Sequence, residues 1–167
     1  MNIKAFFTMP LAFLMMLVSL AFPPQAQADN SIAEIYVRWD AASALTLREY
    51  KIDLARKNLW AYDYYGAPET RERDEKALFE GFTFAGKLSK IKIAAFLAAA
   101  EENDFTAWEG DYPPTYPIVG NAVWRITIVF ADGTTRVSSG DSPDGYPAHW
   151  AEMCAAFNAL AGKVIIL

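Results

Sequence analysis

Apolar and polar residues alternate along several segments of the chain, which is the pattern of β-strands with one buried face. The alternation is clear over Ile35–Trp39, Tyr50–Ala55 and Trp60–Tyr64. Arg56-Lys57-Asn58 forms a short polar connection between the last two segments, so an antiparallel meander is the simplest arrangement. Phe82–Phe84 is a candidate for a further short strand.

Two later segments carry apolar residues at helical spacing. The first, from Lys90 to Asn103, contains no Gly or Pro and follows Ser89, a favourable N-cap residue. The second extends from Ala148 to Gly162. Its predicted buried face consists of Trp150, Met153, Cys154, Phe157 and Leu160.

A β-hairpin is predicted between the two helices. The strand pattern over Trp124–Phe130 leads into Asp132-Gly133, the signature of a type I′ turn with positive φ, and Thr135–Ser139 returns. The proline-rich segment 111–120 before the hairpin cannot be a central strand, because proline has no N–H to donate, so we expect a loop or an edge segment there. The apolar residues 164–167 should pack against the domain.

These elements predict a single α+β domain over residues 29–167, with an antiparallel sheet of about five to six strands and two helices packed on one face. The 139 residues of this segment form one ordinary domain and supply enough chain for a hydrophobic core. Residues 69–76 are mostly charged with mixed signs, which is typical of a solvated loop or a short exposed helix.

The first 28 residues have the features of a secretory signal peptide. Lys4 supplies a positive charge, Ala5–Phe22 is an apolar run, and Ala26-Gln27-Ala28 is a small-x-small cleavage site before Asp29. Prolines interrupt and follow the apolar run, which favours cleavage over a permanent anchor. We therefore expect a periplasmic or secreted protein with no stable membrane span after signal cleavage. An uncleaved N-terminal anchor is the alternative.

The predicted mature chain is acidic. Since the signal holds a single charge, Lys4, residues 29–167 carry 14 basic and 20 acidic side chains, a net charge of −6 with His neutral. Nucleic acids and anionic membranes need a basic face to displace their counterions, so the sequence predicts no nucleic-acid partner. Cys154 is the sole cysteine and permits no intramolecular disulfide, so stability must come from packing.

Residues that could carry catalysis or bind a metal are sparse. His149 and Cys154 are the only residues of their types, which excludes a zinc or copper site built from such ligands, and no cofactor is expected. Ser138 or Ser139 could join Asp141 and His149 in a serine-type triad, but no G-x-S-x-G elbow is present to support one. Asp141 and Asp144 lack the alternating oxygen ligands of a calcium loop. The sequence favours a protein without catalytic activity.

The predicted hairpin and the segment after it form an extended motif. Trp124 to Gly133 reads W-x-I-x-I-x-F-x-D-G, and Ser139-Gly140 and Gly145-Tyr146-Pro147 follow before the last helix. This arrangement resembles small bacterial exported domains of unknown function, and the resemblance covers roughly residues 88–162. It implies a fold and supplies no catalytic residues.

Two functions remain open. The first is an exported, non-enzymatic domain that binds a protein or cell-envelope component, as an inhibitor or immunity-like protein does, because Tyr and Trp are enriched at interfaces. The alternative is a small-ligand or glycan binder, or a weak hydrolase, with an aromatic stacking surface. The candidate ligand-binding residues are Trp60, Tyr62, Tyr64, Tyr112, Tyr116 and Tyr146. Burial of Trp60, Tyr112 and Tyr116 in one core would exclude this alternative.

Overall fold

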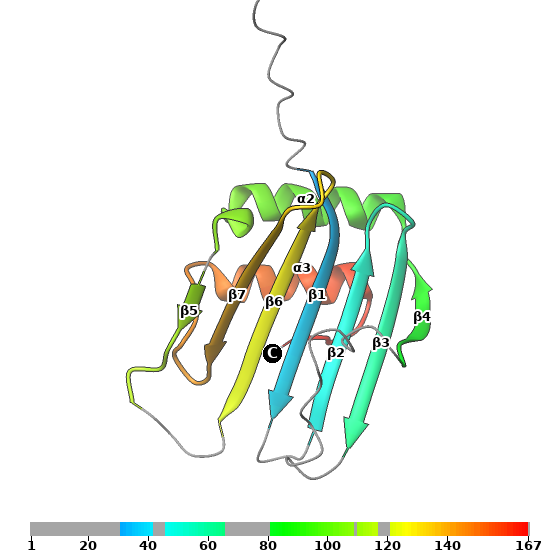
Figure 1. The fold of residues 1–167 in the computed structure, drawn as a ribbon. Helices are drawn as coiled ribbons and strands as arrows, with labels where there is room; N and C mark the ends of the chain where they lie inside the picture. Colours follow the sequence, from blue (N-terminus) through cyan, green and yellow to red (C-terminus); the bar gives the residue numbers. More distant parts are fainter. Residues whose placement is uncertain (1–30, 42–45, 66–80, 109, 117–120, 167) are drawn as a thin grey trace, which may run out of the picture.

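The computed structural model describes residues 31–41, 46–65, 81–108, 110–116 and 121–166, which form a seven-stranded sheet and two α-helices (Figure 1). The strands lie in the order β4-β3-β2-β1-β6-β7-β5. They are β1 (Ile32–Ala41), β2 (Thr46–Asp53), β3 (Asn58–Tyr65), β4 (Thr83–Lys87), β5 (Gly110–Tyr112), β6 (Ala122–Phe130) and β7 (Thr135–Asp141). The predicted signal peptide and the charged segment 69–76 lie outside the described residues.

The fold class is α+β, as predicted, with one strand more than expected. Five of the six neighbouring strand pairs are antiparallel, and only β5 and β7 are parallel. The additional strand is β5, a three-residue edge strand within the proline-rich segment that we predicted to be a loop or an edge. The turn between β2 and β3 occupies residues 54–57, slightly earlier than predicted, and Lys57 has a positive φ of 58°.

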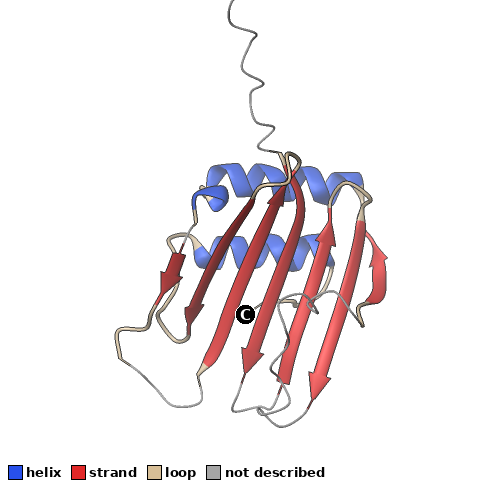
Figure 2. Cartoon of the chain, viewed as in Figure 1, coloured by secondary structure: helices blue, strands red, loops and turns tan. Residues whose placement is uncertain are grey.

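Two helices cover one face of the sheet, α2 (Lys90–Glu102) and α3 (Trp150–Ala161) (Figure 2). The Ser89 hydroxyl accepts a 3.2 Å hydrogen bond from the Lys92 backbone N–H and caps α2 as predicted. Gly162 ends α3 in the left-handed conformation with φ of 71°. Both helices therefore match their predicted ranges to within one or two residues at each end.

The hydrophobic core lies between the sheet and the two helices. Alternate residues of the central strands, such as Ile35 of β1 and Ile128 of β6, face the helices and are fully buried. Phe96 of α2, Phe157 of α3 and Phe105 of the short 3-10 helix η4 (Phe105–Ala107) form a ring cluster with centroids 5.0–6.1 Å apart. Of the predicted α3 face, four residues are buried and Trp150 is half-buried: the four are Met153, Cys154, Phe157 and Leu160.

The β6–β7 hairpin forms as predicted, but its turn is of a different type. The Gly133 N–H donates to Phe130 O at 2.9 Å, and only Gly133 has positive φ, 84°, whereas a type I′ turn needs positive φ at Asp132 as well. Asp132 Oδ1 accepts hydrogen bonds from the Thr134 backbone N–H at 2.8 Å and hydroxyl at 2.6 Å. This side-chain bonding holds Asp132 in an ordinary conformation and leaves the left-handed residue to glycine.

Two residues of the segment after α3 pack into the core, as predicted for residues 164–167, whereas Val164 is exposed and Leu167 lies outside the described residues. Ile165 and Ile166 are both buried. The Asn158 side chain holds them: its Oδ1 accepts from the Ile165 N–H at 2.7 Å, and its Nδ2 donates to Ile166 O at 3.0 Å. One half-buried amide thus supplies partners for backbone groups that have no strand neighbour at this point.

Candidate functional site

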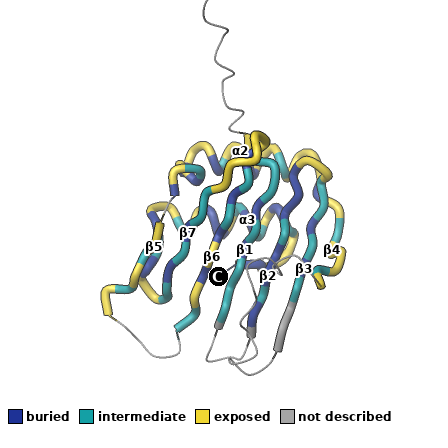
Figure 3. Tube along the Cα trace, viewed as in Figure 1, coloured by how far each residue is buried: buried dark blue, intermediate teal, exposed yellow. Residues whose placement is uncertain are grey.

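The sheet face turned away from α2 and α3, called the far face here, carries most of the charged strand residues. It arises because Tyr36, Arg38 and their alternate neighbours point away from the core face of β1. The burial pattern in Figure 3 follows this alternation along the central strands. Its described side chains include Glu34, Tyr36 and Arg38 of β1, Glu49, Lys51 and Asp53 of β2, Trp60 and Tyr62 of β3, Arg125, Thr127 and Val129 of β6, and Thr135 of β7.

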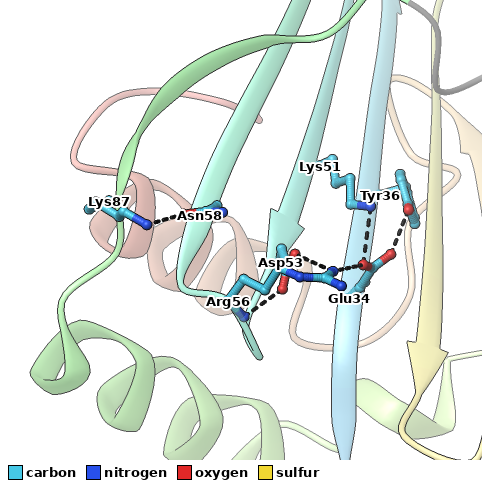
Figure 4. Close-up of polar contacts among 7 residues, drawn as sticks. All are labelled: Glu34, Tyr36, Lys51, Asp53, Arg56, Asn58 and Lys87. Carbon is cyan, nitrogen blue, oxygen red and sulfur yellow. Dashed lines mark hydrogen bonds and ion pairs between the residues drawn. The ribbon is translucent and has the colours of Figure 1, made fainter.

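Glu34 is the centre of one polar cluster on this face (Figure 4). Its carboxylate accepts a 2.6 Å hydrogen bond from the Tyr36 hydroxyl and lies 3.1 Å from the Lys51 Nζ. The Arg56 guanidinium approaches the same carboxylate at 4.0 Å. Tyr36 and Lys51 are direct partners in the β1–β2 register, so the strand pairing itself assembles this cluster.

The cluster shifts the pKa values of two of its members. Burial, together with the neighbouring Glu34 carboxylate, raises the pKa of Tyr36. Burial lowers the pKa of Lys51, but hydrogen bonds to Tyr36 and Glu34 outweigh this effect and the net pKa is raised. Near neutral pH Tyr36 is therefore protonated and Lys51 is a cation, so neither serves as a general base.

Asp53 organises the turn at one end of the far face. Its carboxylate accepts a 2.7 Å hydrogen bond from the Arg56 backbone N–H and lies 3.3 Å from the Arg56 guanidinium. Nearby, Lys87 of β4 donates a 2.7 Å hydrogen bond to the Asn58 side chain of β3. These contacts fix the β2–β3 turn and attach the edge strand, which is a structural role.

Arg38 organises a second cluster nearer the middle of the sheet. Its guanidinium lies 3.5 Å from Asp40 and 3.7 Å from Glu49, and the Glu49 side chain is almost completely buried. Arg125 stands directly opposite Arg38 in the β1–β6 register. Two guanidinium groups on neighbouring strands are tolerated here because the acidic side chains compensate their charge.

A pocket of about 150 Å³ opens on the far face beside these ion pairs. Phe82, which precedes β4, forms one wall, and its ring packs on Tyr62 with centroids 6.1 Å apart. The remaining wall residues come from four strands: Tyr36, Val37 and Arg38 of β1, Glu49 and Tyr50 of β2, Arg125, Thr127 and Val129 of β6, and Thr135 of β7. A cavity of this size with largely apolar walls can hold a group as large as a benzene ring.

Phe82 also borders a second, more open hollow of about 390 Å³. Its other walls are Trp60 and a set of polar residues, namely Lys51, Asp53, Arg56 and Asn58. The Trp60 indole meets the Phe84 ring edge-on at 5.4 Å and is half-buried. The hollow therefore combines an aromatic ring with hydrogen-bonding side chains.

The structure does not bring the six predicted ligand-binding residues together. Trp60 and Tyr62 lie on the far face, whereas Tyr112 and Tyr146 pack against Trp124 on the helix side, at 5.8 and 6.5 Å. Tyr116 is exposed in the loop after β5. The side chain of Tyr64 lies outside the described residues. Because Trp60, Tyr112 and Tyr116 are not buried in one core, the stacking alternative is not excluded.

The sequence analysis did not predict the charged clusters of the far face or the position of Phe82 in the wall of the pocket. Arg38 and Lys51 alternate with apolar residues and Glu34 precedes the first predicted strand, but the strand pattern does not indicate that these residues meet. Their cross-strand contacts depend on register, which the pattern alone does not fix. The charges at alternate positions of two neighbouring strands were the one available signal.

The residues considered for catalysis are not arranged for it. Cys154 is buried on α3, and burial raises the pKa of its thiol to about 12. The Ser139 hydroxyl donates a hydrogen bond to the Asp111 carboxylate. His149 is exposed at the N-terminus of α3, with φ of 59°. Within the described residues, no three His, Cys, Asp or Glu side chains are grouped to hold a metal ion.

Comparisons with protein-family models, curated proteins and solved structures gave no match. In the part of the chain that the structure describes, no helix has the length and apolar character needed to cross a membrane.

Proposed function

We propose that this chain is an exported, non-enzymatic domain that binds a protein or cell-envelope component through the far face of its sheet. The main observation that supports this proposal is the pocket of about 150 Å³ between Phe82 and the sheet. A partner inserts one apolar side chain into it, in the manner of an interface anchor. The surrounding charges then form the polar rim.

The rigidity of the far face supports this proposal. Glu34, Glu49 and Asp53 are each held by a cation or hydrogen bond supplied by a neighbouring strand or turn. A surface whose side chains are fixed before binding loses less conformational entropy when a partner docks. The same fixed ion pairs favour recognition over proton transfer, because Lys51 and Tyr36 retain their protons at neutral pH.

Site-specific photocrosslinking in an envelope extract tests the binding face. The photoreactive residue replaces Thr135, an exposed wall residue of the pocket, and in a matched control replaces Ala151, which is exposed on α3. We expect one crosslinked partner from position 135 and none from position 151. Adding Val129→Trp, which fills the pocket, should abolish the adduct. Equal adducts at both positions, or an adduct that survives pocket filling, would contradict the proposal.

The export part of the proposal has its own test. Intact-mass measurement of protein recovered from the periplasm or medium should show loss of residues 1–28 and a new N-terminus at Asp29. A full-length mass confined to the membrane fraction would support the uncleaved anchor instead.

The hollow beside Trp60 favours glycan or small-ligand binding as a second candidate. An indole next to Asp53 and Asn58 offers a stacking surface and hydrogen-bonding groups for a sugar. Titration with a panel of soluble saccharides, read by tryptophan fluorescence, tests it. Binding must disappear in Trp60→Ala and persist in Tyr116→Ala, since Tyr116 is an exposed loop residue outside the hollow.

A further inference from the structure

The outward face of α2 is unusually apolar for an exposed helix. Of its 13 residues only Phe96 and Ala100 are buried. Ile91 is 83% exposed and Leu97 is 39% exposed, and Ala94 and Ala98 are exposed between them. Exposed large apolar side chains that lie together on one element mark an interaction surface.

The charges of α2 are placed against its own dipole. Lys90 and Lys92 occupy the first turn, where the helix dipole favours acidic side chains. Glu101 and Glu102 occupy the last turn, where the dipole favours basic side chains. This arrangement destabilises the isolated helix. It gives the helix a positive end and a negative end, which makes its surface complementary to an antiparallel copy of itself.

We infer that α2 is the interface of a homodimer, in which it pairs antiparallel with α2 of a second copy of this chain. A twofold axis level with Phe96 places Lys90 against Glu102 of the second copy. The same axis places Ala94 against Ala98 of the second copy, where small side chains allow close approach of the helices. Ile91 and Leu97 flank this contact and become covered. A parallel pairing would instead bring like charges together, so the charge pattern selects the antiparallel one.

The dimer uses a different surface from the proposed binding function. The helices lie on one side of the sheet and the far face on the other, so dimer formation leaves the pocket accessible (Figure 1). One short helix from each copy buries a small area, so the association should be reversible and of modest affinity. Failure of either proposal is therefore separable from failure of the other.

Sedimentation velocity of the purified protein over a concentration series tests this inference. The wild type should pass from monomer to dimer with a micromolar dissociation constant, weakened by added salt. Lys90→Glu alone and Glu102→Lys alone should each weaken the dimer at least tenfold, because each creates two like-charge contacts across the axis. The double variant should restore dimerisation to within about threefold of wild type.

These variants separate association from folding. Each single change places a charge favourably for the helix dipole, so neither should lower the melting temperature of the monomer. Ile91→Ser should also weaken the dimer, by removing apolar contact. A wild type that stays monomeric at every concentration, or single variants that dimerise as well as wild type, would overturn the inference. A monomer that instead binds lipid vesicles through Ile91 would also overturn it.

Discussion

The indole Nε1–H of Trp124 donates a 2.8 Å hydrogen bond to the carbonyl oxygen of Gly145, and Trp124 is completely buried. A Cβ at Gly140 would lie 2.6 Å from Tyr112 O and 2.8 Å from the same indole nitrogen. Gly140 is also the register partner of Trp124. Gly140 and Gly145 of the sequence motif between the hairpin and α3 therefore allow the backbone to pack closely around the buried side chain of Trp124.

Gly140→Ala is expected to destabilise the protein by about 1 to 3 kcal/mol, because a methyl group has no room between two backbone segments and the indole. Trp124→Phe should cost a similar amount, about 1 to 3 kcal/mol, since it leaves the buried Gly145 carbonyl without its donor. Urea denaturation measures both. A free energy of unfolding close to wild type in either variant would contradict the packing described.

Substitution of Gly133 is limited by its backbone conformation and not by lack of space for a side chain. Its φ is 84°, and nothing lies within 4 Å of a Cβ built there. Gly133→Val should therefore destabilise by about 1 to 3 kcal/mol, whereas Gly133→Asn should cost less because asparagine tolerates the left-handed region. Thermal unfolding of the two variants checks the difference, and equal losses would show that strain is not the cause.

Cys154 should behave as a buried core thiol. With its pKa raised to about 12, the native protein should react slowly with a thiol reagent at pH 8 and rapidly once unfolded. The thiol has a lower pKa in the unfolded chain than in the folded protein, so it ionises in the unfolded chain at lower pH. The contribution of the buried thiol to the free energy of unfolding is therefore complete below about pH 8.5 and is lost progressively as the pH rises toward 12.

Substitutions at Cys154 separate packing from polarity. Cys154→Ala should lose this alkaline dependence and be mild, whereas Cys154→Ser should cost about 1 to 3 kcal/mol because a hydroxyl is costlier to desolvate. Rapid labelling of the folded protein would show that the thiol is accessible and make it a functional candidate.

We expect a modest coupling free energy between Glu34 and Lys51. Both side chains are about one-fifth to one-quarter exposed and lie 3.1 Å apart, so a double-mutant cycle with Glu34→Gln and Lys51→Met should give about 0.5 to 1 kcal/mol. Since the pKa values of Tyr36 and Lys51 are raised, the stabilisation that these two groups contribute is complete below about pH 10 and is lost as the pH rises further. Additive single-variant losses would mean that the pair does not interact.

Local patterns predicted most of the fold. Ser89 and the helical spacing after it located α2, and the alternation around Ile126 located the β6–β7 hairpin, because caps and periodicity depend on neighbouring residues only. The predicted type I′ turn at Asp132-Gly133 was wrong, and the parallel pairing of β5 was not predicted. Both depend on contacts that periodicity does not encode, namely a side-chain bond to Thr134 and the position of a distant strand.

The candidate site was less predictable than the fold. Aromatic residue type suggested Trp60 and Tyr112 as members of one surface, but strand order and side-chain alternation place them on opposite faces of the sheet. The residue that borders both hollows, Phe82, was recognised only as part of a short strand. Its role depends on its contacts with Tyr62 of β3 and with residues of distant strands, which only the tertiary structure shows.

The sheet ends on both sides in short strands, β4 with five residues and β5 with three. Each of these two edge strands therefore offers few unpaired backbone groups to another strand, and the register between β3 and β4 is irregular. Short edges of this kind protect a β-protein from edge-to-edge aggregation. They also favour a partner that recognises side chains over one that docks by strand addition.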